Sequence, residues 1–307
     1  MKPVVYPADY LFRPDPPSLA AFGRRLLAEG DSWFTIGSLN LPQASNVLFK
    51  LEFEQSHVVV NCAYPGETLQ HMVDHLHDPY FDRLLRHPRF ASYWEAVLVS
   101  AGGNDLIDAA QVPPVDAKGR PIPADRRLLL TPQEAAAQAG AGGTVVSAHH
   151  VSDAGWDRLA AYLRANVATL VARRDQGPSA GRPIFLHTYA VPTVRPAGTL
   201  GAAKGWLYPA CVTAGVPESL RQGVAVLLFE RLRQLLLGLA DGCGQPHALP
   251  QVHVFDSAAL PGIQPAAPGS TGLSGDWINE IHLSPAGYAK MGRPFGAFID
   301  GVLAAYP

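Results

Sequence analysis

The sequence predicts an α/β fold in which helices cover both faces of a mainly parallel sheet. Short apolar runs end in turn-forming residues, which is typical of buried parallel strands. Segments with helical periodicity lie between these runs, so strand and helix alternate. Such alternation predicts right-handed crossovers, which gather functional side chains at the carboxyl ends of the strands.

Five runs are candidate strands: Arg25–Glu29, His57–Asn61, Ala96–Ser100, Ile184–Tyr189 and Val252–Phe255. The expected helices between and after them are Gln43–Gln55, Thr68–Leu85, Ser152–Arg174, Glu218–Leu239 and Ser284–Ala304.

Two stretches break this alternation. Ile107 to Gly143 is rich in Pro, Ala and Gly, and Val194 to Pro217 carries Trp206 and Tyr208 as candidates for an acyl pocket. We expect both to be insertions into one domain spanning residues 1–307. They would serve as lids, binding loops or subunit contacts, or be partly disordered.

The composition of the 307 residues excludes several classes of function. The formal net charge is -2, which gives no broad attraction toward nucleic acid or acidic membranes. The most apolar stretch, Val224 to Ala240, is interrupted by charged residues, and the N-terminus lacks the apolar core of a secretory signal. The sequence therefore predicts no transmembrane segment and a cytoplasmic location. Cys62, Cys211 and Cys243 are too few and too widely spaced for a disulfide framework or a thiolate metal site.

Ser32 is the candidate nucleophile. It lies in Gly30-Asp31-Ser32-Trp33, directly after the first candidate strand, where a turn would hold its hydroxyl at the carboxyl edge of the sheet. Taken alone, the tripeptide Gly-Asp-Ser is more often a turn or a helix N-cap.

Two later strand ends carry groups that could stabilise an oxyanion. Gly66 offers a backbone amide and Asn104 a side-chain amide, and such donors contribute roughly 3 kcal/mol each in acyl-transfer sites. His282, shortly before the last expected helix, could serve as the general base toward Ser32 and then protonate the leaving group.

These four blocks, in this order, resemble the SGNH hydrolase superfamily, also called GDSL-type lipases and esterases. The resemblance spans residues 30–288 and implies a three-layer α/β/α fold. It also implies that the Ser32 amide, the Gly66 amide and the Asn104 side chain form the oxyanion hole, with Ser32 and His282 as catalytic residues. The implied activity is ester hydrolysis through an acyl-enzyme, with no cofactor or metal.

The sequence departs from this family at the position of the catalytic acid. Where the family usually has an aspartate, three residues before the histidine, this chain has Asn279. An amide oxygen can accept from Nδ1–H and fix the imidazole tautomer, although it adds no charge stabilisation. Asn279 is therefore the favoured partner, and the alternatives are Asp276, Glu280, Asp256 or a backbone carbonyl.

Two other functions remain open at this point. His71 and His75 have the spacing of a metal site on a helix, with His77 nearby, which would suit a metal-dependent hydrolase. The glutamate of the H-E-x-x-H motif is absent, so a solvated histidine cluster is the better interpretation. Asn279 also leaves open a noncatalytic binding module on the same scaffold.

Overall fold

A six-stranded parallel sheet forms the centre of the protein. The computed structural model describes residues 1–35, 45–74, 76–199 and 204–306. Its strands have the order β1-β3-β2-β4-β5-β6, and every neighbouring pair is parallel. Their bounds are β1 Val4–Pro7, β2 Arg24–Gly30, β3 His57–Asn61, β4 Ala96–Ser100, β5 Ile184–His187 and β6 Val252–Phe255.

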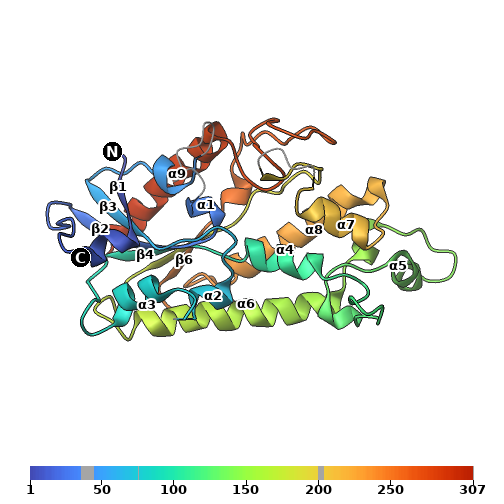
Figure 1. Ribbon diagram of the computed structural model, residues 1–307, viewed down its shortest axis with the longest axis horizontal. Helices are drawn as coiled ribbons and strands as arrows, with labels where there is room; N and C mark the ends of the chain where they lie inside the picture. Colours follow the sequence, from blue (N-terminus) through green and yellow to red (C-terminus); the bar gives the residue numbers. More distant parts are fainter. Residues whose placement is uncertain (36–44, 75, 200–203, 307) are drawn as a thin grey trace.

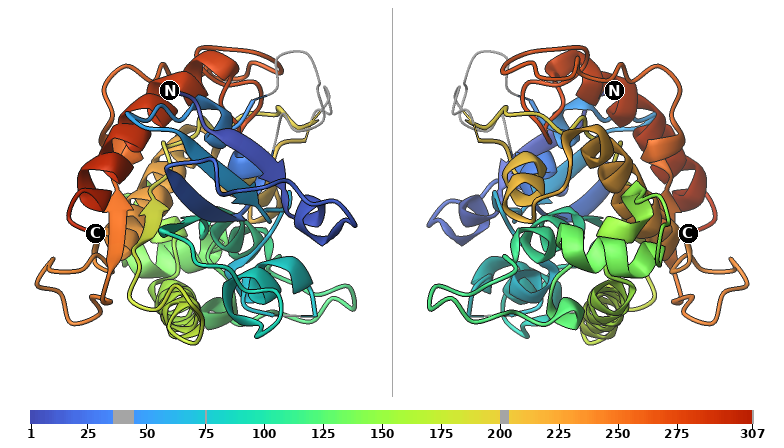
Figure 2. Two further views of the ribbon diagram at one scale, coloured as in Figure 1. Left: turned by 90° about the vertical axis from the view of Figure 1, so that its left-hand side faces the viewer. Right: turned by 90° about the vertical axis from the view of Figure 1, so that its right-hand side faces the viewer.

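Helices lie on both faces of this sheet and beyond the carboxyl ends of its strands (Figure 1). They are α1 Ser32–Thr35, α2 Leu69–Met72, α3 Pro79–Arg86, α4 Gly103–Gln111, α5 Pro132–Ala139, α6 Asp153–Arg174, α7 Leu207–Thr213, α8 Glu218–Leu237 and α9 Pro285–Leu303. In Figure 1 and in both views of Figure 2, α9 lies on one side of the sheet and α6 on the other. The predicted three-layer α/β/α fold is confirmed.

Local sequence explains where the long helices begin. The Ser152 hydroxyl accepts from the Gly155 N–H at the start of α6, and the Ser284 hydroxyl accepts from the Gly287 N–H at the start of α9. These N-caps satisfy backbone donors that the first helical turn leaves without partners. The five predicted strands are confirmed to within two residues. The edge strand β1 was not predicted, because its four residues follow Pro3, end in Pro7 and carry too short a pattern.

The predicted helix Gln43–Gln55 is wrong for its described part, residues 45–55. Only Leu48–Lys50 forms a helical turn, of the 3-10 type. The apolar residues Val47, Leu48, Leu51 and Phe53 are buried because this segment crosses directly beneath α9. A side chain at Gly296 would collide with the backbone of Glu52. The apolar spacing therefore reflects burial under a helix rather than helical periodicity.

The predicted helix Thr68–Leu85 is also wrong, because two short helices replace it. Asp78 accepts from the Tyr80 and Phe81 N–H groups and starts α3 anew at Pro79, whose ring cannot continue a preceding helix.

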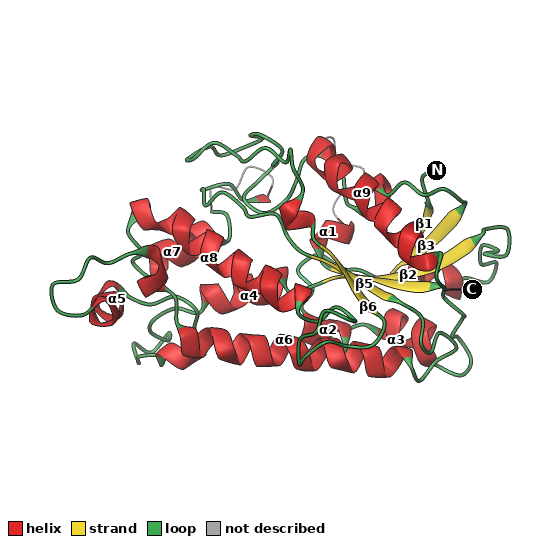
Figure 3. Cartoon of the chain, turned by 180° about the vertical axis from the view of Figure 1, so that it is seen from behind, coloured by secondary structure: helices red, strands yellow, loops and turns green. Residues whose placement is uncertain are grey.

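Both stretches that break the strand–helix alternation extend past the carboxyl ends of the strands. The first stretch contains most of α4 and all of α5, which begins at a capping box formed by Thr131 and Glu134. The second contains α7, and its residues 200–203 lie outside the described residues. Figures 1 and 3 show α4, α5 and α7 together beyond this end of the sheet. No helix in the described part of the chain is long and apolar enough to cross a membrane.

Candidate active site

Ser32 lies at the carboxyl edge of the sheet because β2 ends in a close contact with β4. Gly30 has φ +155°, and a Cβ there would be 2.7 Å from the Ser100 carbonyl oxygen, so only glycine fits. The next N–H, of Asp31, donates to the same carbonyl at 3.0 Å. The chain then turns at once into α1, which Ser32 begins.

Ser32 contacts His282, and His282 contacts Asn279. The Ser32 Oγ and His282 Nε2 atoms are 2.6 Å apart, and His282 Nδ1 lies 3.0 Å from Asn279 Oδ1. The same Asn279 oxygen accepts from the Ile281 and His282 backbone N–H groups. Since only an oxygen can accept from these two donors, the amide orientation is fixed and Nδ1 must carry its proton. Nε2 is then the unprotonated atom that faces the serine.

His282 is neutral at physiological pH. It is 3% exposed, and burial lowers its pKa to about 3. Trp206, one of the two aromatic residues expected for an acyl pocket, packs against it, with its ring perpendicular to the imidazole and the ring centroids 5.4 Å apart; its place in an acyl pocket stays a prediction.

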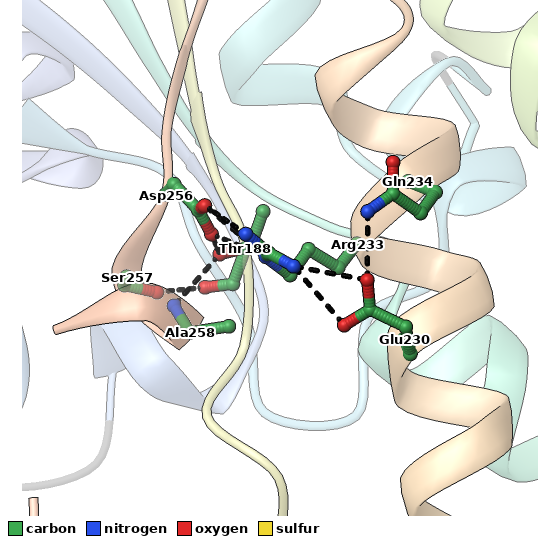
Figure 4. A network of polar contacts seen from close by, with 7 residues as sticks. All are labelled: Thr188, Glu230, Arg233, Gln234, Asp256, Ser257 and Ala258. Carbon is green, nitrogen blue, oxygen red and sulfur yellow. Dashed lines mark hydrogen bonds and ion pairs between the residues drawn. The ribbon is translucent and has the colours of Figure 1, made fainter.

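The three alternative acids have other partners. Asp276 pairs with Lys290 at 2.6 Å, and Glu280 accepts four backbone hydrogen bonds described below. Asp256 pairs with Arg233 at 2.6 Å, within the network drawn in Figure 4. Among the described contacts of His282 Nδ1, the Asn279 oxygen is the side-chain acceptor.

Gly66 lies in the turn after β3, and Asn104 lies close by in the first turn of α4. Gly66 has φ +80° in an exposed turn after β3, and the Asn104 Nδ2 donates to the Glu67 carbonyl at 3.0 Å. Asn104 and Ser32 line one small hollow, whose described lining does not include Gly66. The oxyanion role of all three donors stays a prediction.

Two residues hold the loop that carries His282: Arg195, which the sequence analysis missed, and Glu280, which it considered only as an alternative acid. The buried Arg195 guanidinium donates to the Asn279 carbonyl at 2.7 Å. Glu280 accepts from the backbone N–H groups of Arg195 and of residues 206–208. We call this pair, Arg195 and Glu280, the loop clamp. It ties the stretch from Val194 to Pro217 to the loop that carries His282. A lone arginine in a Pro/Gly-rich stretch does not indicate such a contact.

A buried polar chain lies beneath Ser32, formed by Asp31, Ser100 and His187. Ser100 Oγ is 2.7 Å from Asp31 Oδ1 and 2.9 Å from His187 Nε2, while His187 Nδ1 donates to the Thr188 carbonyl. Two hydrogen bonds join Asp31 Oδ1, Ser100 Oγ and His187 Nε2, so two hydrogens are needed, and the Ser100 hydroxyl supplies one of them. The other must reside on Asp31 or on His187.

The electrostatic environment favours Asp31 as the site of that proton. Burial raises the pKa of Asp31 to about 6, against hydrogen bonds from Tyr189, Ser100 and Trp33 that lower it. Burial lowers the pKa of His187 to about 4. A neutral carboxyl thus lies one residue before Ser32 at mildly acidic pH.

The histidines considered for a metal do not assemble a site among the described residues. The rings of His71 and His77 are stacked at 4.6 Å, and His77 bonds Asp74 at 2.8 Å. His75 lies outside the described residues. No group of three His, Cys, Asp or Glu able to hold a metal ion occurs in the part that is described.

Comparison with known proteins finds likeness in structure only. No protein-family model and no curated protein sequence matches the chain. An extracellular lipase from Streptomyces rimosus is 14% identical at a TM-score of 0.46, covering 91% of this chain and 99% of that one. A phospholipase A1 from Streptomyces albidoflavus is 14% identical at 0.44, covering 92% and 99%.

A carbohydrate acetylesterase from Sinorhizobium meliloti is also similar, at 12% identity and a TM-score of 0.38, covering 92% of this chain and 100% of that one. At such identities and TM-scores, these likenesses assign no activity to the chain.

Proposed function

We propose that this protein is a serine ester hydrolase of the SGNH type, with Ser32 as nucleophile and His282 as general base. The observation that carries the proposal is the chain of hydrogen bonds from Ser32 Oγ through His282 to Asn279 Oδ1. Its geometry meets the requirement that nucleophile, base and orienting group lie within hydrogen-bond reach of one another.

The reaction follows from the tautomer that Asn279 imposes. Nε2 takes the Ser32 proton as Oγ bonds to the ester carbon, and the tetrahedral oxyanion is stabilised by the Ser32 and Gly66 amides and the Asn104 side chain. Nε2–H then protonates the alcohol oxygen as the carbon–oxygen bond breaks. Water, deprotonated by His282, attacks the acyl-enzyme and releases the acid and free Ser32.

The test is turnover and labelling of Ser32. We expect the wild-type protein to hydrolyse p-nitrophenyl acetate and to react once with a fluorophosphonate, with the adduct mapped to Ser32 by mass spectrometry. Ser32→Ala should lower kcat by about 10⁴-fold or more and abolish labelling, because removal of a catalytic serine has effects of that order. Ser219→Ala, an exposed serine at the start of α8, is the matched control.

A folded wild-type protein that neither turns over nor is labelled would refute hydrolysis. That result would favour a binding module on this scaffold.

A further inference from the structure

The hollow beside Ser32 has apolar walls from three parts of the fold. Ile107 comes from α4, Phe229 from α8, and Trp277 and Ile281 from the loop before α9. All four side chains are at least nine-tenths buried. They are therefore held by packing on their other sides.

The hollow is small. The space within it that the centre of a water-sized group can occupy is about 20 Å³, which is room for about one such group. The hollow is partly open to solvent, but its walls are close-packed, so a larger occupant that stays within it must push walls aside, and overpacking of this kind is unfavourable. A methyl group suits the space, whereas a chain of several methylenes does not.

The positions of the polar groups indicate which part of an ester enters the hollow. A tetrahedral carbon on Ser32 carries an oxyanion, the leaving alcohol oxygen and the acyl substituent. The leaving oxygen must face His282, which protonates it, and the oxyanion must face Asn104, which lines the same hollow. The remaining substituent, the acyl carbon chain, is the one that meets the apolar walls.

Resting on the proposed ester hydrolysis, we propose that this hollow is the acyl site and selects acetyl esters. Phe229 and Ile107 are the residues that limit acyl length. The step is the one written above with a two-carbon acyl group: the acetyl group is transferred to Ser32 Oγ, the alcohol leaves with the proton that His282 took from Ser32, and water then releases acetate.

The experiment compares p-nitrophenyl acetate, butyrate and octanoate, which share one leaving group, so the ratios of kcat/KM report the acyl fit. One methylene changes kcat/KM by roughly 10- to 200-fold in a filled apolar pocket. We therefore expect wild-type kcat/KM for the acetate to exceed that for the octanoate by more than about 100-fold. A second series of acetates with larger alcohols should show no such decline.

Two variants enlarge the hollow from different helices. Phe229→Leu and Ile107→Ala should each raise the butyrate-to-acetate ratio of kcat/KM by about 10-fold, because each removes part of a wall. Phe298→Leu is the matched control, since Phe298 packs against the core from α9 and does not line the hollow. Thermal melting identifies any variant that fails to fold, and the other variant then carries the test.

Each outcome decides the inference. Hydrolysis of the octanoate as efficiently as the acetate would overturn it, and so would unchanged ratios in both folded variants. In either case Ser32→Ala would still abolish turnover, so the proposed function would stand. If no ester is turned over and Ser32 is not labelled, the proposed function fails and the acyl site fails with it.

Discussion

Asn279→Asp would test how much activation the serine gains from a charge behind the histidine. Aspartate at this position would place a carboxylate oxygen where Oδ1 now lies, 3.0 Å from His282 Nδ1. A unit charge about 4 Å from an imidazolium stabilises it by roughly 4 kcal/mol at an effective dielectric constant of 20. Burial of the new carboxylate offsets part of this gain, because its hydration is lost. A net 1–3 kcal/mol remains as our order-of-magnitude estimate.

That magnitude predicts two measurable changes. Because one pKa unit corresponds to about 1.4 kcal/mol, the pKa of His282 should rise from about 3 by roughly one to two units. The acid limb of kcat/KM then moves upward to about pH 4–5, and kcat rises by about 10-fold or more at pH 7, since the imidazolium formed in the transition state is stabilised. The assay is a pH profile of p-nitrophenyl acetate hydrolysis, with circular dichroism at each pH.

The comparison variant is Asn166→Asp, which adds the same charge on α6. It should leave both quantities unchanged. A folded Asn279→Asp protein whose kcat falls and whose acid limb does not move would refute the view that this oxygen orients the imidazole. Large kcat losses in Asp276→Ala or Asp256→Ala would transfer the role to those carboxylates.

Three further predictions concern the buried groups around the site. Asp31 has its pKa raised from 3.8 to about 6 on folding, so stability present below pH 4 should decline by on the order of 3 kcal/mol as pH rises through 6. His187→Phe should reduce that decline, measured by urea unfolding at pH 4 and 8, because it frees the Ser100 hydroxyl to donate to the carboxylate; an equal decline would contradict the hydrogen count. Burial and the adjacent Asp78 carboxyl raise the pKa of Glu29 well above its ordinary value. The free energy of unfolding of Glu29→Gln should therefore fall less than that of the wild type over the same pH increase. An identical dependence of the unfolding free energy on pH in the two proteins would rule this out. Arg195→Met should lower kcat about 10-fold or more with little change in KM, as measured by initial rates, because it loosens the histidine loop; a change confined to KM would argue against positioning.

The local parts of the fold and site could be predicted from the sequence. Each predicted strand contains a short apolar run followed by turn-forming residues, and Ser32 and Asn104 come within a few residues of the ends of two of them. Asn279 and His282 are three residues apart, so their pairing required only one loop. Information of this kind lies within a few residues of each feature.

What could not be predicted depends on residues far apart in the sequence. His187 and Asp31 share a chain of hydrogen bonds although about half the molecule separates them in sequence. Arg195 binds a carbonyl more than 80 positions later, and a carbonyl leaves no mark in a sequence. Residues 45–55 have apolar residues at helical spacing because they are buried against α9 at Gly296, and not because they form a helix. Tertiary packing set these features, and single-sequence patterns do not record it.

The loop clamp has a consequence for how the protein would lose activity. Ser32 is held at the sheet edge because the N–H of the preceding residue, Asp31, donates to the Ser100 carbonyl. The position of His282 instead depends on Arg195 and Glu280, which lie in loops beyond the carboxyl ends of the strands. The two halves of the catalytic pair are thus secured to different parts of the molecule. Gentle heating should loosen the loops that hold Arg195 and Glu280 before the sheet unfolds. Turnover should therefore vanish at a temperature where the protein still gives its native circular dichroism signal, and it should return on cooling.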